Sequence, residues 1–421
     1  MKIYLVGGAV RDSLLNLPVK DRDWVVVGGS KEILLKKNFQ QVGKDFPVFL
    51  HPITHEEYAL ARKERKSGIG YTGFSTDYNS HVTLEEDLIR RDLTINAIAY
   101  DEDGNYIDPF GGKKDIKNRL LRHISQSFTE DPLRILRTAR LAASLTHLGF
   151  QIAEETILLM RIMVEKGELL YLTPNRIWNE TEKAFNTINP HVYFQILYKC
   201  KALHLFFPEV NFLYQKKNIS SYYIFNKLYN KNIILKGLAK ISTLCKDIDV
   251  RFAYLCRFLS TNVLYSNSLH NSSFNSSLKK KYDKKSCDLV SSLCKRFYIP
   301  SYIRDIAILN TRFCFFLDTI DYQSSKNIVM LFYKIDAWRK PERVQKLAFL
   351  SQFNFLNISK SYFTYINSGF FLEKCFSVIK NVSAKLVLDQ GLKGNNIKNE
   401  LIRLRIKKLE SWRVNNKNLF C

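Results

Sequence analysis

The stretch KDRDWVVVGG (residues 20–29) places two aspartates directly before an apolar run. The run WVVV is typical of a strand, in which alternate side chains share a face, so Asp21 and Asp23 point the same way. Arg22 and Trp24 then point the other way. Two neighbouring carboxylates repel each other and are costly to bury unpaired, whereas Mg²⁺ binds carboxylate oxygens together with substrate phosphates. The stretch therefore predicts a magnesium site, and a solvated acidic strand end is the alternative.

A glycine turn precedes this stretch. KIYLVGG (residues 2–8) is typical of a short strand that ends in glycines, and AVRDSLLNL (residues 9–17) is typical of a helix. Glycines let a backbone approach a ligand closely, the start of a helix offers free N–H groups, and Arg11 adds a cation. Gly8 and Arg11 are therefore predicted to bind phosphate, although a Gly-Gly turn is often no more than a turn.

A third acid is expected on a further strand. EYALAR (residues 57–62) has the same apolar character as the strand after Asp23, and Glu57 opens it. Strand alternation turns Glu56 to the opposite face. Glu57 is therefore the third candidate catalytic acid.

Residues 85–100, EEDLIRRDLTINAIAY, are expected to form a helix with several polar side chains. Arg91 is predicted to bind a triphosphate, and Asp92 and Asn96 are predicted to hydrogen-bond sugar hydroxyls. The alternative is a solvated helix face, on which Arg90 pairs with Glu86.

Residues 130–140, EDPLRILRTAR, predict a second polar set on a helix. Asp131 and Arg134 lie three positions apart and can together read the Watson–Crick edge of a base. Arg137 and Arg140 continue the basic stripe towards phosphates. The alternative is a surface ladder of salt bridges.

A further helix start follows in LTPNRIWNETEKAF (residues 172–185). Thr173 is expected as its N-cap and Pro174 as its first residue. We expect this helix to support the site without taking part in the chemistry.

The composition indicates a globular chain of several domains, with 421 residues of which 46% are hydrophobic. No apolar run approaches the roughly 18 residues of a membrane span, and charged residues come too early for a signal peptide. The cysteines, all at or after Cys200, show no metal-ligand spacing and are expected to be reduced core thiols. A cytoplasmic protein without a membrane partner is expected.

The charge is unevenly distributed along the chain. Residues 1–130 hold 19 basic and 19 acidic residues, so residues 131–421 carry the whole net charge of +24. This distribution favours a neutral chemical head and a basic part that holds a polyanion, while a generically basic surface is the alternative. Residues 261–286 are rich in Ser, Asn and then Lys, and are expected to form a mobile loop or linker.

The motifs, in this order, resemble the class II tRNA nucleotidyltransferases, the CCA-adding enzymes, of the polymerase-beta-like nucleotidyltransferase superfamily, and most closely the enterobacterial type. The matching segments are GGAVRD at 7–12, DRDWVVVG at 21–28, DFPVFLHPITHEEYALARKERKSG at 45–68, RRDLTINA at 90–97, EDPLRILRTAR at 130–140 and LTPNRIWNETE at 172–182. The resemblance implies an α+β fold, with a small mixed-sheet head and an elongated all-helical remainder. The expected parts are a catalytic head (1–125), a base-recognising neck (126–210), a helical body (211–330) and a tRNA-binding tail (331–421).

The resemblance also implies an activity, which is transfer of CMP, CMP and AMP from CTP and ATP to the 3′ end of tRNA without a template. Asp21 and Asp23 would hold Mg²⁺, with one ion activating the tRNA 3′-hydroxyl and another neutralising the leaving pyrophosphate. Asp131 and Arg134 would select C or A. The nucleoside triphosphate would be held by Gly8, Arg11, Arg91, Arg137 and Arg140. Whether the protein is a monomer or a dimer stays open.

One part departs from the enterobacterial pattern. That type carries an HD phosphohydrolase region, in which adjacent His and Asp bind a metal, but the corresponding position here is Arg257-Phe258. An arginine is always protonated and cannot replace a neutral imidazole ligand. We therefore expect the phosphohydrolase activity to be lost. Three other functions stay open: a poly(A) polymerase, an enzyme that adds only C or only A, and a non-catalytic RNA-binding relic.

Overall fold

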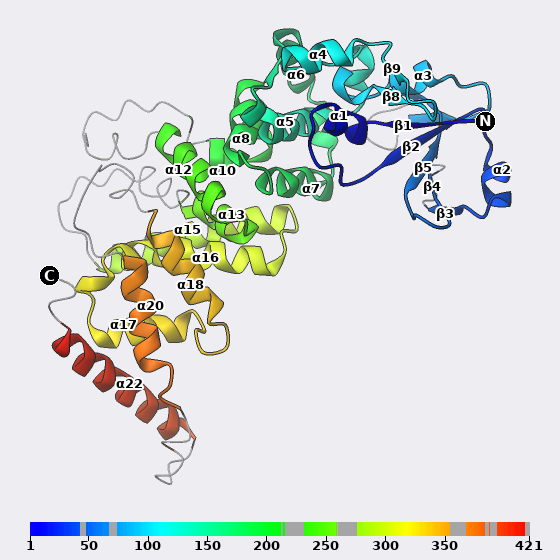
Figure 1. The fold of residues 1–421 in the computed structure, drawn as a ribbon. Helices are drawn as coiled ribbons and strands as arrows, with labels where there is room; N and C mark the ends of the chain where they lie inside the picture. Colours follow the sequence, from blue (N-terminus) through cyan, green and yellow to red (C-terminus); the bar gives the residue numbers. More distant parts are fainter. Residues whose placement is uncertain are drawn as a thin grey trace. The chain divides into compact units, whose positions relative to one another are not determined.

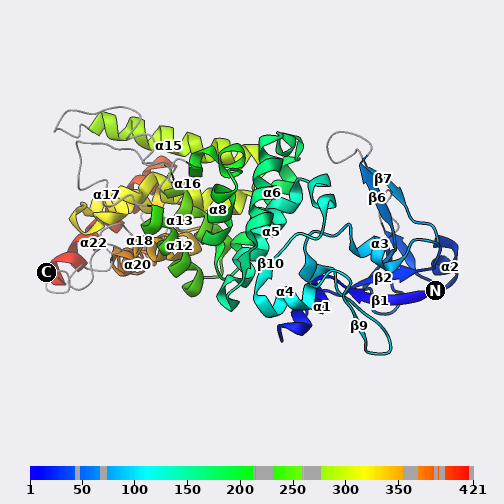
Figure 2. The same cartoon turned by 90° about the horizontal axis from the view of Figure 1, so that it is seen from above.

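The computed structural model describes residues 1–42, 48–66, 74–211, 214, 231–257, 259, 276–353, 368–383, 387 and 394–416. The chain divides into two compact units, Met1–Pro208 and Glu209–Cys421 (Figures 1 and 2). Among the described residues, no helix is long and apolar enough to cross a membrane.

A mixed seven-stranded sheet forms the start of the first unit, in the order β3-β4-β5-β2-β1-β8-β9. Strands β2 and β5 are parallel neighbours, and every other neighbouring pair is antiparallel. The strands are β1 (Lys2–Val6), β2 (Asp23–Val27), β3 (Gln40–Val42), β4 (Val48–Leu50), β5 (Glu57–Leu60), β8 (Ala99–Tyr100) and β9 (Tyr106–Ile107). The expected mixed-sheet head is confirmed.

The run WVVV is continuous because both faces of β2 are covered. Val25 belongs to a core cluster with Leu84 and Leu88 of helix α3 (Leu84–Leu88). Val26, the next residue, packs in another cluster with Leu34 of α2 (Lys31–Lys36). Since successive side chains of a strand point to opposite faces, a strand between two layers is apolar at every position.

Helices make up most of the rest of the first unit, which also has two small two-stranded sheets, β6 (Lys63–Lys66) with β7 (Phe74–Asp77) and β10 (Leu120–Leu121) with β11 (Gln151–Ile152). Helix α5 packs on α7 and α8 (Figure 1). Thr173 is the N-cap of α7 and Pro174 its first residue, as predicted. These helices are α1 (Gly8–Leu14), α4 (Gly112–Asn118), α5 (Leu133–Leu145), α6 (Glu154–Glu165), α7 (Pro174–Phe185), α8 (Pro190–Lys199) and α9 (Leu203–Phe206), and two short 3₁₀ helices, η1 (Thr94–Asn96) and η2 (Gln126–Glu130), precede α5.

The described residues of the second unit are helical. Helix α13 packs along α16, and a further core joins α17, α18, α20 and α22. The expected α+β class, a sheet followed by helices, is therefore confirmed. The main helices are α12 (Lys231–Leu244), α13 (Ile248–Arg257), α15 (Ser276–Arg296), α16 (Ser301–Asp318), α17 (Ser325–Lys334), α18 (Glu342–Ser351), α20 (Ser368–Ile379) and α22 (Asn395–Asn415).

Two expectations about local structure are wrong. Residues 276–286 belong to α15, so the Ser/Asn/Lys-rich segment is helical there, and its residues 261–275 lie outside the described part. Residues 85–100 do not form one helix, because α3 ends at Leu88 and the chain extends at Leu93 to pair with His123. Residues 92–99 are buried throughout, which a one-sided helix cannot be.

Candidate active site

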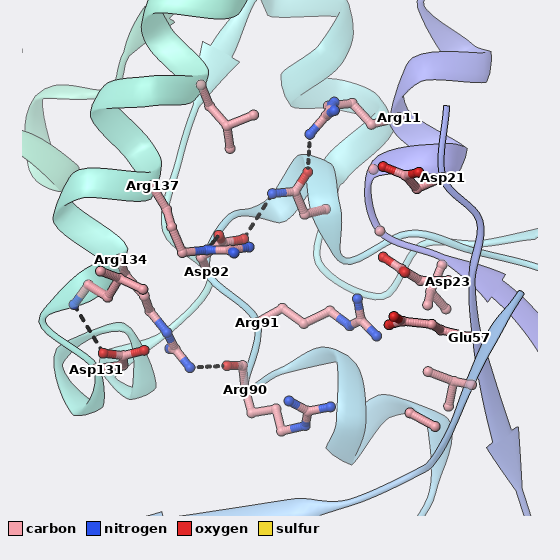
Figure 3. A pocket seen from close by; sticks show the side chains of 18 of the residues that line it. Arg11, Asp21, Asp23, Glu57, Arg90, Arg91, Asp92, Asp131, Arg134 and Arg137 are labelled. Carbon is pink, nitrogen blue, oxygen red and sulfur yellow. Dashed lines mark hydrogen bonds and ion pairs between the residues drawn. The ribbon is translucent and has the colours of Figure 1, made fainter. Parts of the chain in front are cut away.

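A cavity of about 810 Å³ lies within the first unit, between the sheet and helices α5 and α7 (Figure 3). All twelve predicted site residues line it, from segments more than a hundred positions apart. They are Gly8, Arg11, Asp21, Asp23, Glu57, Arg91, Asp92, Asn96, Asp131, Arg134, Arg137 and Arg140.

The acids lie where two parallel strands begin. Asp23 opens β2 and pairs in register with Glu57, the first residue of β5. Asp21 precedes the strand instead of lying in it, which corrects the strand argument, yet it lines the same cavity. Arg22 and Trp24 both contact Glu56, with Arg22 Nη1 3.7 Å from Oε1 and Trp24 Nε1 donating to Oε2 at 3.0 Å. The chain therefore separates the cavity acids from Glu56.

The three cavity carboxylates have no partner among the described residues. No hydrogen bond or ion pair to Asp21, Asp23 or Glu57 occurs in this part of the chain. Within the same residues, no three His, Cys, Asp or Glu side chains are gathered closely enough to hold a metal ion. The side chains of Asp21, Asp23 and Glu57 thus face the cavity without a bond to another described side chain (Figure 3).

Gly7 lies between the Asp23 carboxylate and the Arg91 guanidinium. Its φ of +75° lies in the left-handed region, and a Cβ there would come 3.2 Å from Arg91 Nη1 and 3.8 Å from Asp23 Oδ2. Only glycine fits this approach without strain. The turn before α1 therefore brings the Arg91 guanidinium and the Asp23 carboxylate to one place.

Arg91 is held on its other side by Asp87, a fully buried residue that sequence reasoning missed. Arg91 Nη2 donates to Asp87 Oδ2 at 3.1 Å, and Arg90 Nη2 donates to Oδ1 at 2.5 Å. The alternative of a solvated face, on which Arg90 pairs with Glu86, does not hold, because Glu86 caps α3 with Thr83 and pairs with Lys63. Burial raises the pKa of Asp87, but the charges of Arg90 and Arg91 outweigh it and lower the pKa.

A chain of hydrogen bonds crosses the cavity wall from α1 to α5. Arg11 Nη1 donates to Asn96 Oδ1 at 2.8 Å, and Asn96 Nδ2 donates to Asp92 Oδ1 at 2.9 Å. Arg137 Nε then donates to Asp92 Oδ2 at 2.8 Å. Burial would raise the pKa of Asp92, but the Arg137 charge and these hydrogen bonds hold it far below its usual range. Asp92 and Asn96 thus connect two cations in the protein (Figure 3).

The predicted base-reading pair is anchored by other parts of the unit. Asp131 lies before the first residue of α5, where its Oδ1 accepts the Leu133 N–H at 3.0 Å. Arg134 is buried, and it donates to the carbonyls of Ser127 at 2.7 Å and Arg90 at 2.5 Å. The alternative of a surface salt-bridge ladder within this segment is not what the structure has.

Helix α7 supports the site, as expected, and it also contributes side chains to the cavity wall. Arg176 Nη2 donates to Asp131 Oδ2 at 2.9 Å, and Arg140 Nε donates to the buried Glu180 at 2.6 Å. Arg176 and Lys183 also line the cavity. Their spacing of seven residues on one helix could have suggested a shared basic face.

In the second unit, Arg257 is buried in α13. Its Nη2 donates to Asp318 Oδ2 of α16 at 2.5 Å. Burial lowers the pKa of Arg257, but the Asp318 charge outweighs it and raises the pKa. A fixed cation therefore occupies the position at which the sequence resemblance leads us to expect a His-Asp pair.

A nucleotidyltransferase class follows from this site and from the family models. Residues 3–122 match the Poly A polymerase head domain, and residues 149–213 match the family described as "Probable RNA and SrmB- binding site of polymerase A". The sheet with its acids falls within the first match, and α7 falls within the second.

Comparison with individual proteins narrows the class. The chain is 71% identical to the CCA-adding enzyme of Buchnera aphidicola subsp. Acyrthosiphon pisum (strain Tuc7), over 99% of this chain and 98% of that protein. A CCA-adding enzyme solved with ATP has the same fold (22% identity, TM-score 0.63, 97% of this chain and 86% of that chain). The Thermotoga maritima CCA-adding enzyme complexed with tRNA is also similar (20%, TM-score 0.59, 97% and 87%). The chain belongs to the CCA-adding enzyme family.

Proposed function

We propose that this protein adds CMP, CMP and AMP to the 3′ end of tRNA, using CTP and ATP and releasing pyrophosphate. The observation that carries the proposal is the 71% identity along nearly the whole length of a CCA-adding enzyme, together with one cavity that all twelve expected residues line. The predicted cytoplasmic location fits this role in tRNA maturation.

The acids of the cavity suit Mg²⁺. Asp21 and Asp23 offer hard oxygen ligands that make no ion pair or hydrogen bond with the described residues, and Glu57 begins the neighbouring strand. Mg²⁺ typically binds one or two carboxylates and completes its shell with water and substrate phosphates. When bound, it would supply charge neutralisation for the triphosphate and acidify the attacking hydroxyl.

The cations of the cavity would bind and orient the triphosphate. Arg91 lies beside Asp23 across Gly7, so it faces the same phosphates as the acids. Arg11 lies one turn into α1, whose first N–H groups would face an anion bound in the cavity. Arg137 and Arg140 extend this positive wall along α5, while Asp131 and Arg134 at its start would read the base.

The remaining parts would hold the RNA. Residues 131–421 carry the net charge of +24, which favours contact with the tRNA backbone. We propose the divisions stated above: a head (1–125), a neck (126–210), a body (211–330) and a tail (331–421).

Asp92 and Asn96 would act on the sugar hydroxyls only by giving up the hydrogen bonds they make within the protein, so we assign them chiefly to orienting Arg11 and Arg137.

Extension of a tRNA that lacks its 3′ CCA tests the proposal. With CTP alone the product should gain two residues, and with CTP and ATP it should gain three and then stop. Long A tails would instead make the protein a poly(A) polymerase, and growth by C only or A only would make it a partial enzyme. An inactive wild type that still binds tRNA would make it an RNA-binding relic.

We also propose that the second unit lacks phosphohydrolase activity. Arg257, paired with Asp318, is a fixed positive charge that repels a metal ion. A colorimetric phosphatase assay of pure protein with Ni²⁺ or Mg²⁺ should stay at background, and clear turnover would overturn this proposal.

A further inference from the structure

Asp87 is a buried carboxylate that binds the site residue Arg91 and has no predicted role of its own. It lies in α3 with none of its surface exposed and does not line the cavity. Its Oδ1 accepts Arg90 Nη2 at 2.5 Å, Arg90 Nε at 3.1 Å and the backbone N–H of Arg62 at 3.3 Å. Its Oδ2 accepts Arg91 Nη2 at 3.1 Å. Each oxygen of Asp87 therefore binds a different one of two consecutive arginine side chains.

Each arginine leads to a different part of the cavity. Arg91 extends from Asp87 to the Gly7 turn, where its Nη1 lies beside the position of Asp23 Oδ2. Arg90 stays against Asp87, and its carbonyl oxygen accepts Arg134 Nη2 at 2.5 Å. One carboxylate thus holds the side chain of Arg91 and the side chain of Arg90, whose carbonyl anchors Arg134.

We propose that Asp87 is a positioning residue for nucleotidyl transfer, which sets Arg91 against the triphosphate and Arg134 against the base at the same time. The inference rests on the proposed function. Two guanidinium groups repel each other, and the side chains of Arg90 and Arg91, just after the end of α3, converge on Asp87 because its desolvated carboxylate offsets that repulsion. Without that carboxylate, Arg91 is free to leave Gly7, and the carbonyl that orients Arg134 moves with Arg90.

Whether Asp87→Asn weakens or strengthens triphosphate binding distinguishes a positioning residue from one that acts only through its charge. Replacing Asp87 by Asn removes a negative charge near the cavity. If Asp87 acted only through its charge, the variant protein would therefore bind a triphosphate more tightly than the wild type. A positioning role predicts weaker binding, because Arg90 and Arg91 donate to different oxygens of Asp87, and an Asn replaces one of these oxygens by an NH₂ group that cannot accept.

The experiment measures binding and selectivity on the full chain. Calorimetry with Mg²⁺ gives the affinity for CTP and for inorganic triphosphate, and extension of tRNA lacking CCA gives the ratio of kcat/KM for CTP over UTP. For Asp87→Asn we expect about tenfold weaker binding of both anions, and about tenfold lower selectivity, from the loss of one charged hydrogen-bond network. Unchanged or tighter triphosphate binding would overturn the proposal.

Asp115 provides the matched control. It is also buried in the first unit, where it accepts from Thr94 Oγ1 at 2.7 Å and pairs with Arg122, but it does not line the cavity or touch a residue that binds there in our proposal. Asp115→Asn should lose stability and keep triphosphate affinity and selectivity. Equal losses in both variants would reduce Asp87 to a structural acid.

Asp87→Glu keeps the proposal testable if Asp87→Asn fails to fold. It retains the charge, and so the fold, but moves the carboxylate outward by one methylene, so triphosphate binding should still weaken while the melting temperature stays near that of the wild type. A folded Asp87→Glu protein with unchanged binding and selectivity would refute the inference. If the wild type itself adds no nucleotide, the proposed function fails instead, and the two failures are distinguishable.

Discussion

The acids of the two units differ in what neutralises them. In the second unit, three described carboxylates have protein cations: Asp318 pairs with Arg257, Asp249 with Lys346, and Asp305 with Arg343. In the first unit, Asp21, Asp23 and Glu57 line a cavity with no such partner among the described residues. A carboxylate paired inside the protein stabilises the fold, whereas one left facing a cavity with a neighbouring acid is arranged for a cation from outside.

The largest expected effect comes from removing the cavity acids. Asp21→Ala with Asp23→Ala should lower the rate of CMP addition by about 10³-fold or more, because metal binding contributes several kcal/mol to the transition state. The tRNA affinity, measured by filter binding, should stay near that of the wild type. Activity within tenfold of the wild type would contradict the assignment of these acids.

Removing the partner of a paired acid in the second unit should lower the stability of the protein. Arg257→Met leaves Asp318 without its guanidinium, and we expect a loss of about 3 kcal/mol in the free energy of unfolding, measured with urea. Adding Asp318→Leu should recover most of that loss, since an apolar pair can replace a buried ion pair. A single variant as stable as the wild type would show that this pair contributes nothing.

A smaller effect is expected at the glycine turn. Gly7→Ala must adopt a φ of +75° and place its Cβ 3.2 Å from Arg91, so we expect a loss of about 1–2 kcal/mol in stability and about tenfold in kcat/KM for CTP. Gly149→Ala is the control, because Gly149 has a φ of +86° but no atom within 4 Å of its Cβ position. It should share the backbone cost and keep kcat/KM.

The smallest effect concerns Arg176 of α7. Arg176→Met removes the hydrogen bond that orients Asp131, and we expect the CTP-over-UTP selectivity to fall about fivefold, with a lesser change in kcat for CTP. Arg161→Met offers a comparison, because Arg161 also joins two segments of the first unit, through the Lys199 carbonyl, but does not line the cavity. Equal selectivity of the two variants would contradict a role for Arg176.

Sequence reasoning works where one element decides the outcome. Strand alternation separates Asp23 from Trp24, and Thr173-Pro174 marks the start of α7, because both depend on local geometry. It fails for residues 92–99, since a segment buried on all sides carries no periodic signal.

Contacts between segments that lie far apart in the sequence could not be predicted either. Asp87 resembles any acid in an amphipathic helix until Arg62, Arg90 and Arg91 are seen around it. Arg176 meets Asp131 only because α5 and α7 pack together, and nothing in either segment states which neighbour it will have. Twelve of the cavity residues were therefore predictable, while Arg176 and Lys183, and the contacts that orient the twelve, were not.

The central claim is that the unpaired acids of the first unit hold a divalent cation and the paired acids of the second unit do not. Electron paramagnetic resonance of Mn²⁺, with CTP present and tRNA absent, tests it most directly. We predict that binding is lost in the Asp21→Asn, Asp23→Asn variant and retained in Arg257→Met. Undiminished Mn²⁺ binding by the double variant would contradict the account.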